Sequence, residues 1–395
     1  MRVAETTQFA PRPARTEGEQ RIVLLDVLRG VAILGTLGTN IWIFTEPGGL
    51  LAAITRLEDD VSVVEAVLRF LANGKFLGML TILFGVGLEI QRASATRRGK
   101  RWPGRYLWRM ALLFADGVLH YVLVVEFDIL MGYAVTGIVV SYLVLTSERA
   151  QRRWMIAAGA VHVLLVTAVT FLLATASAED PGGPPITIYT DGSYLDQIRF
   201  RFEHMAAFRA EPIYTIPMAV CLFLLGTRLY RAGAFGADER GRAIRRRLMI
   251  YGLGIGVPLN LATALSGNFA LGFVDRYLLP PLVALGCIGL LGWLIERVRQ
   301  GWVTASLASM GRMALSCYMM QNILASVLCY GWGLGLAAKL VDIRALWTPL
   351  AWLAIALVLL VFSRLWLARF RQGPFEAVWR WAVESPRRRR PARPN

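Results

Sequence analysis

The first candidate for chemistry is a histidine near the end of an apolar segment. His120 lies four residues after Asp116, which places both side chains on one face of a helix, and Asp128 follows in the next hairpin. A carboxylate that bonds one ring nitrogen fixes the imidazole tautomer and raises its basicity, as an acid–base histidine requires. Either aspartate could do this. In the alternative interpretation, His120 is a structural residue that bonds a neighbouring helix.

A second set of polar residues shares one helical face earlier in the chain. Asp26 and Arg29 are three residues apart, and Asn40 follows Arg29 by eleven residues. At 100° and 1.5 Å per residue, Arg29 and Asn40 point the same way about 16 Å apart. The face therefore offers a cation near one end of the helix and an amide near the other. In the alternative interpretation, Asp26 and Arg29 form an ion pair that only anchors the helix.

Other apolar segments carry polar groups at comparable depths. Asn260, Gln321 and Asn322 lie about 18–24 Å from the start of their segments, as His120 does, whereas Arg312 lies near the opposite surface. Polar groups in such segments are costly and are functional-site hypotheses by default. If these faces converge, they line a path with cations at one end and neutral hydrogen-bonding groups further along.

The elements that position these residues are apolar blocks too long for globular helices. The chain of 395 residues is 56% hydrophobic with a mean hydropathy of +0.50, and 18% of its residues are charged, against about 25% in soluble proteins. A helix needs about 20 apolar residues to cross a bilayer. We predict an all-α polytopic membrane helix bundle with about ten transmembrane helices. The predicted spans are 22–44, 74–92, 106–125, 127–146, 153–176, 213–235, 248–266, 273–296, 306–331 and 346–366.

The distribution of basic residues predicts the orientation. Thirty-one Lys and Arg residues fall in the two terminal tails and in the connections after even-numbered spans, and nine fall in the other connections. Basic residues are retained on the cytoplasmic side of a membrane. Both termini are therefore expected in the cytoplasm, and the expected location is a bacterial inner membrane.

Three regions follow from this topology. Residues 1–21 form a cytoplasmic tail, residues 22–366 form the transmembrane bundle, and residues 367–395 form a basic cytoplasmic tail. The outer loop 177–212 is either a partly helical lid on the membrane surface or part of an acceptor site. The segment 61–72 has apolar residues at helical spacing and is expected to lie along the membrane interface.

Several classes of function are disfavoured. The net charge of +16 lies in short loops, which indicates topology rather than nucleic-acid binding. All four cysteines fall within predicted spans without a CxxC pair, so no metal is expected. The chain has no GxxxxGK[ST], HExxH or GxSxG motif. The glycines of 252–256 fit a close contact between helices better than a nucleotide loop.

Several motifs spread over residues 21–383 resemble one bacterial membrane-protein family, called domain of unknown function 418. They are Arg21-Ile-Val-Leu-Leu-Asp26-Val-Leu-Arg29-Gly30, Phe84-Gly85-Val86-Gly87, Gly117-Val-Leu-His120, Asp128-Ile-Leu-Met-Gly-Tyr133-Ala134, Gly311-Arg312-Met-Ala-Leu-Ser-Cys-Tyr318-Met-Met-Gln321, and Gly373-Pro374-Phe-Glu376 before Trp379-Arg380. The resemblance implies an inner-membrane helix bundle.

The first motif is also similar to the first helix of membrane acyltransferases of the acyltransferase-3 and heparan-glucosaminide N-acetyltransferase types. Acyltransferase-3 proteins have an arginine, ten residues and then a catalytic histidine. Here Arg29 matches the arginine, but Asn40 stands at the histidine position. The heparan-type enzymes have an asparagine there and use a histidine shortly downstream, whereas residues 41–57 contain none. An acyltransferase mechanism would therefore need His120 as its base.

The leading hypothesis is an acyltransferase that moves an acyl group from cytosolic acyl-CoA to a small molecule or to a lipid- or envelope-linked sugar. Arg29 and Arg312 would attract the CoA phosphates, and Asn40 and Gln321 would orient the acyl carbonyl. His120 would deprotonate the acceptor. The alternatives are a transporter that uses the same polar path without chemistry, and a non-catalytic membrane subunit.

Overall fold

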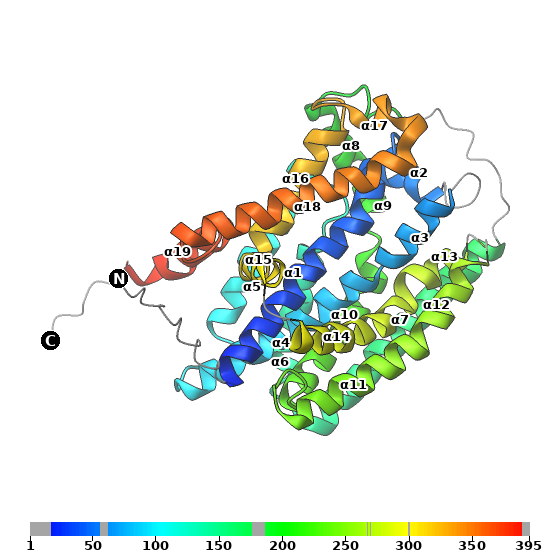
Figure 1. The fold of residues 1–395 in the computed structure, drawn as a ribbon. Coiled ribbons are helices and arrows are strands. Elements are labelled where there is room, and N and C mark those ends of the chain that lie inside the picture. The colour runs from blue at the N-terminus through cyan, green and yellow to red at the C-terminus, as the bar shows by residue number, and fades with distance from the viewer. Residues whose placement is uncertain are drawn as a thin grey trace, which may run out of the picture.

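The computed structural model describes residues 17–55, 62–175, 186–266, 268, 270–298 and 301–388, and the regular structure in these ranges is helical (Figure 1). The expected tail 1–21 therefore lies almost entirely outside the described residues, as do residues 389–395 of the expected basic tail. Ten of the helical segments coincide with the predicted spans. They are α1 (Glu17–Phe44), α4 (Lys75–Arg97), α5 (Arg105–Leu123), α6 (Leu130–Leu143), α7 (Glu148–Thr175), α10 (Pro212–Arg231), α11 (Glu239–Gly254) with α12 (Gly256–Ala264), α14 (Pro280–Arg297), α15 (Trp302–Arg312) with α16 (Ala314–Cys329), and α18 (Arg344–Arg369).

Shorter helices connect these segments. They are α2 (Gly49–Thr55), α3 (Val63–Ala72), α8 (Tyr194–Glu203), α9 (Met205–Phe208), α13 (Leu271–Phe273), a π-helix (Val274–Leu278), α17 (Leu336–Lys339), a 3₁₀-helix (Val341–Ile343) and the C-terminal α19 (Pro374–Arg388). The expected interface helix is α3, whose Val63, Val64 and Leu71 are exposed. The described part of the outer loop is partly helical, and its role as a lid or as part of an acceptor site stays a prediction.

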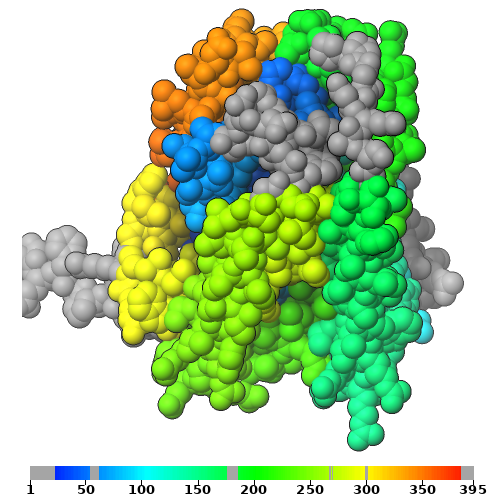
Figure 2. Space-filling model, turned by 90° about the vertical axis from the view of Figure 1, so that its right-hand side faces the viewer, coloured from blue at the N-terminus to red at the C-terminus, as the bar shows by residue number. Residues whose placement is uncertain are grey.

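Six helical runs within the described residues are long and apolar enough to cross a membrane, and α6 and α16 are shorter apolar helices. An all-α membrane helix bundle is therefore confirmed, whereas the number of crossings stays a prediction. In Figure 2, α7 and α11–α12 face the viewer. This surface exposes many large apolar side chains, among them Leu164, Phe171 and Tyr251. Such a surface suits contact with lipid.

The helix α1 lies at the centre and packs against α4, α15 and α16. Its contact with α15 brings two backbones together. A Cβ atom added at Gly30 would lie 2.2 Å from the Leu307 carbonyl oxygen, and one added at Gly311 would lie 1.8 Å from the Asp26 carbonyl oxygen. Only glycine permits this approach. The crossing holds the Asp26–Arg29 turn against the end of α15.

Two predicted spans are broken, one of them for a clear reason. The proline ring of Pro258 has no N–H to bond the Gly254 carbonyl, and α11 accordingly ends at Gly254. The helices α11 and α14 also approach closely, since a Cβ atom at Gly252 would lie 2.3 Å from the Gly286 nitrogen. This confirms the close helix contact predicted for the glycines of 252–256.

Candidate functional site

A histidine–aspartate pair is buried where α5 ends and α6 begins. The His120 Nδ1 atom is 2.9 Å from Asp128 Oδ1, and both side chains are fully buried. The second carboxylate oxygen of Asp128 accepts a hydrogen bond from the Met131 backbone N–H at 3.2 Å, in the first turn of α6. The N-terminus of a helix attracts a carboxylate. The start of α6 therefore holds Asp128 in place beside the imidazole.

The other ring nitrogen of His120 contacts α16. The Asn322 Nδ2 atom lies 3.2 Å from His120 Nε2, and the Tyr318 ring is centred 5.2 Å from the imidazole. With Asn322 Nδ2 as the donor, Nε2 accepts and Nδ1 donates to Asp128. Asn322, rather than Gln321, is the amide that meets His120.

The second candidate carboxylate does not hold the imidazole. Asp116 Oδ2 accepts a hydrogen bond from Trp379 Nε1, which belongs to α19. Of the two aspartates that the sequence offered, only Asp128 bonds His120. Asp116 instead joins α5 to the C-terminal helix.

A large cavity in the described part of the chain has a volume of about 640 Å³. It lies between α1, α4, α5, α16 and α19. Its wall is mainly apolar and is formed by Ile33, Leu80, Leu83, Phe84, Met110, Leu113, Ile129, Leu130, Ala314, Leu315, Tyr318 and Val383. Tyr318, which contacts the ring of His120, lines this cavity. Its volume is in the range of pockets that bind small molecules.

Four arginines line the same cavity, namely Arg29, Arg105, Arg109 and Arg380. Arg29 also bonds Asp26, with Nη1 3.0 Å from Oδ1, and Arg109 bonds Gln91 at the short limit of hydrogen-bond lengths, at 2.5 Å. Guanidinium groups match phosphate oxygens in geometry and charge. A cavity with arginines and long apolar walls is suited to an anionic amphiphile.

A smaller polar pocket of about 40 Å³ shares two lining residues, Tyr318 and Ile129, with the large cavity. Its wall includes Asn40, Arg276 and Glu211. Arg29 and Asn40 thus lie on one helical face, as predicted, but they line two different spaces.

The remaining predicted residues do not converge on His120. Arg312 is exposed and does not line the large cavity. Asn260 donates to Asp275 Oδ1 at 2.7 Å, in the π-helix. Gln321 is fully buried, and its side-chain amide has no hydrogen-bond partner among the described residues. The predicted convergence therefore holds for spans three and nine, through His120 and Asn322, but not for Asn260.

The outer segment is fastened to the hairpin that carries Asp128. Arg209 donates hydrogen bonds to the carbonyl oxygens of Glu126 and Asp128. Arg201 lies 3.5 Å from the Glu126 carboxylate, and Tyr189 donates to Glu126 Oε1 at 2.8 Å. Burial, together with the negative charge of Glu126, raises the pKa of Tyr189, so its hydroxyl remains a donor. These contacts fix the hairpin and hence the His120–Asp128 pair.

Sequence reasoning missed the arginines of α5 and the contribution of α19. Arg105 and Arg109 are four residues apart and therefore share a helical face, which is a readable signal. Glu376, Trp379 and Arg380 also line the cavity, although the sequence placed them in a tail. These residues belong to one of the motifs on which the family resemblance is based. Their presence in that motif indicated a role in the bundle.

The fold and the site define a class, an all-α membrane protein with a buried His–Asp pair beside a cavity lined by arginines. The model of the family described as protein of unknown function DUF418 matches residues 229–385. Similar proteins are the uncharacterized YxaH of Bacillus subtilis, which is 27% identical with 92% of this chain and 94% of the relative covered, and the uncharacterized YeiB of Escherichia coli, which is 29% identical with 91% and 96% covered. An uncharacterized 39.9 kDa protein of Bacillus acidopullulyticus is 27% identical. These similarities support the DUF418 family that the motifs predicted.

Proposed function

We propose that this protein is a bacterial inner-membrane acyltransferase that takes an acyl group from cytosolic acyl-CoA and transfers it to a small-molecule or to an envelope- or lipid-linked acceptor. The observation that carries the proposal is the large cavity, which combines four arginines with a long apolar wall and extends to Tyr318. An acyl-CoA has the same two parts, a phosphorylated head and an apolar acyl arm.

The cavity changes which arginines we assign to the CoA phosphates. Arg29 keeps this role, whereas Arg312 lies outside the cavity wall. Arg105, Arg109 and Arg380 take its place, because they line the cavity with Arg29. The bilayer remains the proposed environment, and the acceptor would approach from the pocket that contains Asn40.

His120 is the proposed general base, with Asp128 holding its Nδ1 proton. Its Nε2 would take the proton of the acceptor hydroxyl or amine as the acceptor attacks the thioester carbonyl. The carbon–sulfur bond then breaks, and the proton leaves with the CoA thiol. For this step the Asn322 amide must release Nε2 and the Tyr318 ring must move, since they cover the imidazole in this structure.

The donor site can be tested by binding. Palmitoyl-CoA and acetyl-CoA should each be titrated against the purified full chain while its melting temperature is measured. Binding to the folded state raises the melting temperature. Arg109→Ala should weaken binding by about tenfold or more, because a charge-assisted hydrogen bond is lost.

The matched control is Arg152→Ala. Arg152 is an exposed arginine of α7 that does not line the cavity, so acyl-CoA should bind this variant as it binds the parent. If neither acyl-CoA changes the melting temperature of the parent protein, the donor assignment is wrong.

A transporter is the second candidate, and one observation favours it. The large cavity and the small polar pocket meet at Tyr318 and Ile129, as two vestibules on either side of a gate would. A transporter would move its solute past Tyr318 without leaving a covalent product. Mass spectrometry of acceptor lipids and sugars from cells with and without the protein separates the two functions.

A further inference from the structure

The C-terminal helix α19 covers one side of the large cavity. It contacts α5 and α16, so that it spans the space between them (Figure 1). Four of its residues line the cavity, namely Glu376, Trp379, Arg380 and Val383. No other predicted role accounts for this placement, because the sequence assigns this segment to a tail.

One fastening joins α19 to the N-terminus of α16. Glu376 Oε1 accepts hydrogen bonds from the backbone N–H groups of Leu315 at 2.9 Å and Ser316 at 3.3 Å. Its Oε2 accepts a hydrogen bond from the Ser316 hydroxyl. The first N–H groups of a helix have no partner within the helix, and a negative charge there is favoured by the helix dipole. A side chain of α19 thus caps α16.

A second fastening joins α19 to α5. Trp379 Nε1 donates a hydrogen bond to Asp116 Oδ2, and Trp108 Nε1 donates one to the Ala382 carbonyl oxygen at 3.3 Å. These contacts lie on the side of α19 that faces the bundle. On the opposite side, Val378 and Trp381 are 61% and 68% exposed.

A short non-helical segment separates α19 from α18. Residues 370–373 are not helical, and the Trp366 indole bonds the Gln372 carbonyl oxygen at 2.9 Å. A few such residues can absorb the backbone rotation of a hinged element. The helix therefore has a short non-helical link at one end and its polar contacts along one face.

We propose that α19 is a hinged lid over the cavity, held shut by Glu376 on the N-terminus of α16 and by Trp379 on Asp116. Opening breaks both fastenings and exposes the arginine-lined wall to a ligand. Because α16 also carries Tyr318 and Asn322, closing the lid fixes the helix that covers His120. The proposal does not depend on which ligand enters.

The test measures access to the cavity directly. Gly87 lines the cavity, and a Cβ atom there would meet only Arg29 Nη2, at 3.8 Å. Gly87→Cys, in a full chain whose four native cysteines are replaced, is therefore a well-tolerated probe. Its reaction rate with a water-soluble maleimide is measured in lipid nanodiscs, where both faces of the membrane are accessible.

Loss of a fastening should speed the reaction. Glu376→Gln removes the charge that caps α16, and Trp379→Phe removes the donor to Asp116 at similar size. Each should raise the labelling rate about tenfold, which corresponds to the loss of one charge-assisted hydrogen bond. Trp381→Phe, on the exposed side of α19, is the matched control and should leave the rate unchanged.

Locking the lid should have the opposite effect. In the Gly87→Cys chain, Trp108→Lys and Ala382→Lys can be joined by a short cleavable amine-reactive crosslinker, which leaves the thiol of residue 87 unmodified, because the two residues are in contact. Crosslinking should slow labelling of residue 87 about tenfold, and cleavage should restore it. Equal rates with the lid locked and released would overturn the proposal. This comparison decides the matter even if Glu376→Gln does not fold.

Discussion

At the scale of single residues, each ring nitrogen of His120 has a defined partner. Nδ1 lies against the Asp128 carboxylate and Nε2 against the Asn322 amide, so with Asn322 as the donor Nε2 is the accepting nitrogen and faces α16. This is the tautomer that a general base needs. The proposed function requires only that Nε2 exchange the Asn322 amide for the acceptor.

Replacing the histidine separates chemistry from packing. His120→Gln retains a hydrogen-bonding side chain but removes the titrating nitrogen. Transfer should fall by about 10²-fold or more, the usual scale for loss of a general base, while acyl-CoA binding stays intact. Asp128→Asn should reduce the rate of transfer less, because it disturbs the orientation of the imidazole ring rather than removing the base. Product formation and acyl-CoA binding are measured on the same preparations.

The pH dependence gives the control for this experiment. A base must be unprotonated, so transfer by the parent protein should rise with increasing pH, and the rise should be missing in His120→Gln. Full activity of His120→Gln would show that His120 is a structural contact between α5 and α16.

The choice between the two carboxylates was beyond sequence reasoning. Asp116 is four residues before His120, and Asp128 is eight residues after it, so both are within reach. The first turn of α6 decides the outcome, because it bonds Asp128 through the Met131 N–H. Asn322 is 202 residues away in sequence from His120, and no local pattern distinguishes it from Gln321.

At the scale of elements, the length of the apolar segments predicted the positions of the long helices well. It predicted the breaks within those helices less well. The break before Gly256 follows from Pro258, whereas the one at Met313 has no proline to announce it. The helix α19 was missed because it is too polar on average for a span, and a helix of that kind is visible only by its periodicity. Two of the family motifs have a physical explanation. Gly30 belongs to one and Gly311 to the other, and both lie where α1 crosses α15.

This crossing should be sensitive to one methyl group. In Gly311→Ala, the added Cβ atom would lie 1.8 Å from the Asp26 carbonyl oxygen, so α1 and α15 must move apart. We expect destabilisation by about 1–3 kcal/mol, the usual cost of overpacking. Gly87→Ala is the matched control, since its Cβ atom has room and alanine favours a helix by up to about 1 kcal/mol. Melting temperatures in detergent should therefore move in opposite directions, and a stable Gly311→Ala protein would contradict the structure of the crossing.

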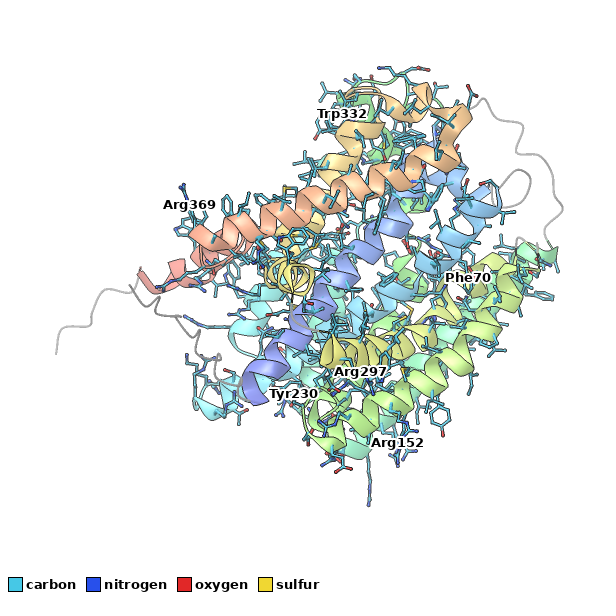
Figure 3. All side chains as sticks on the ribbon, viewed as in Figure 1. Phe70, Arg152, Tyr230, Arg297, Trp332 and Arg369 are labelled. Carbon is cyan, nitrogen blue, oxygen red and sulfur yellow. The ribbon has the colours of Figure 1, made fainter. Side chains whose placement is uncertain are left out.

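At the scale of the whole molecule, the bundle has two distinct ends. Figure 3 shows Arg152, Tyr230, Arg297 and Arg369 toward one end and Phe70 and Trp332 toward the other. The first four lie in or beside connections that the sequence assigns to the cytoplasm, and the last two lie beside connections assigned to the outside. These six residues lie at the ends that the charge pattern predicts for them, and the full membrane topology stays a prediction.

The sidedness of the cavity follows from the same argument, and a pair of matched cysteines can test it. Arg240 is exposed at the start of α11, near the basic end, and the Arg199 side chain is 75% exposed in α8, at the other end. Each cysteine is introduced into a variant of this protein without native cysteines, and the variant is expressed in intact cells. An impermeant maleimide should label Arg199→Cys and leave Arg240→Cys unreacted until the membrane is permeabilised. The physical reason is that seven basic residues surround the connection between α10 and α11, and basic connections are retained in the cytoplasm. The opposite pattern would place Arg105, Arg109 and Arg380 outside the cell, where no acyl-CoA is present. An acyl-CoA donor would then be excluded, while the helix bundle and its His120–Asp128 pair would stand.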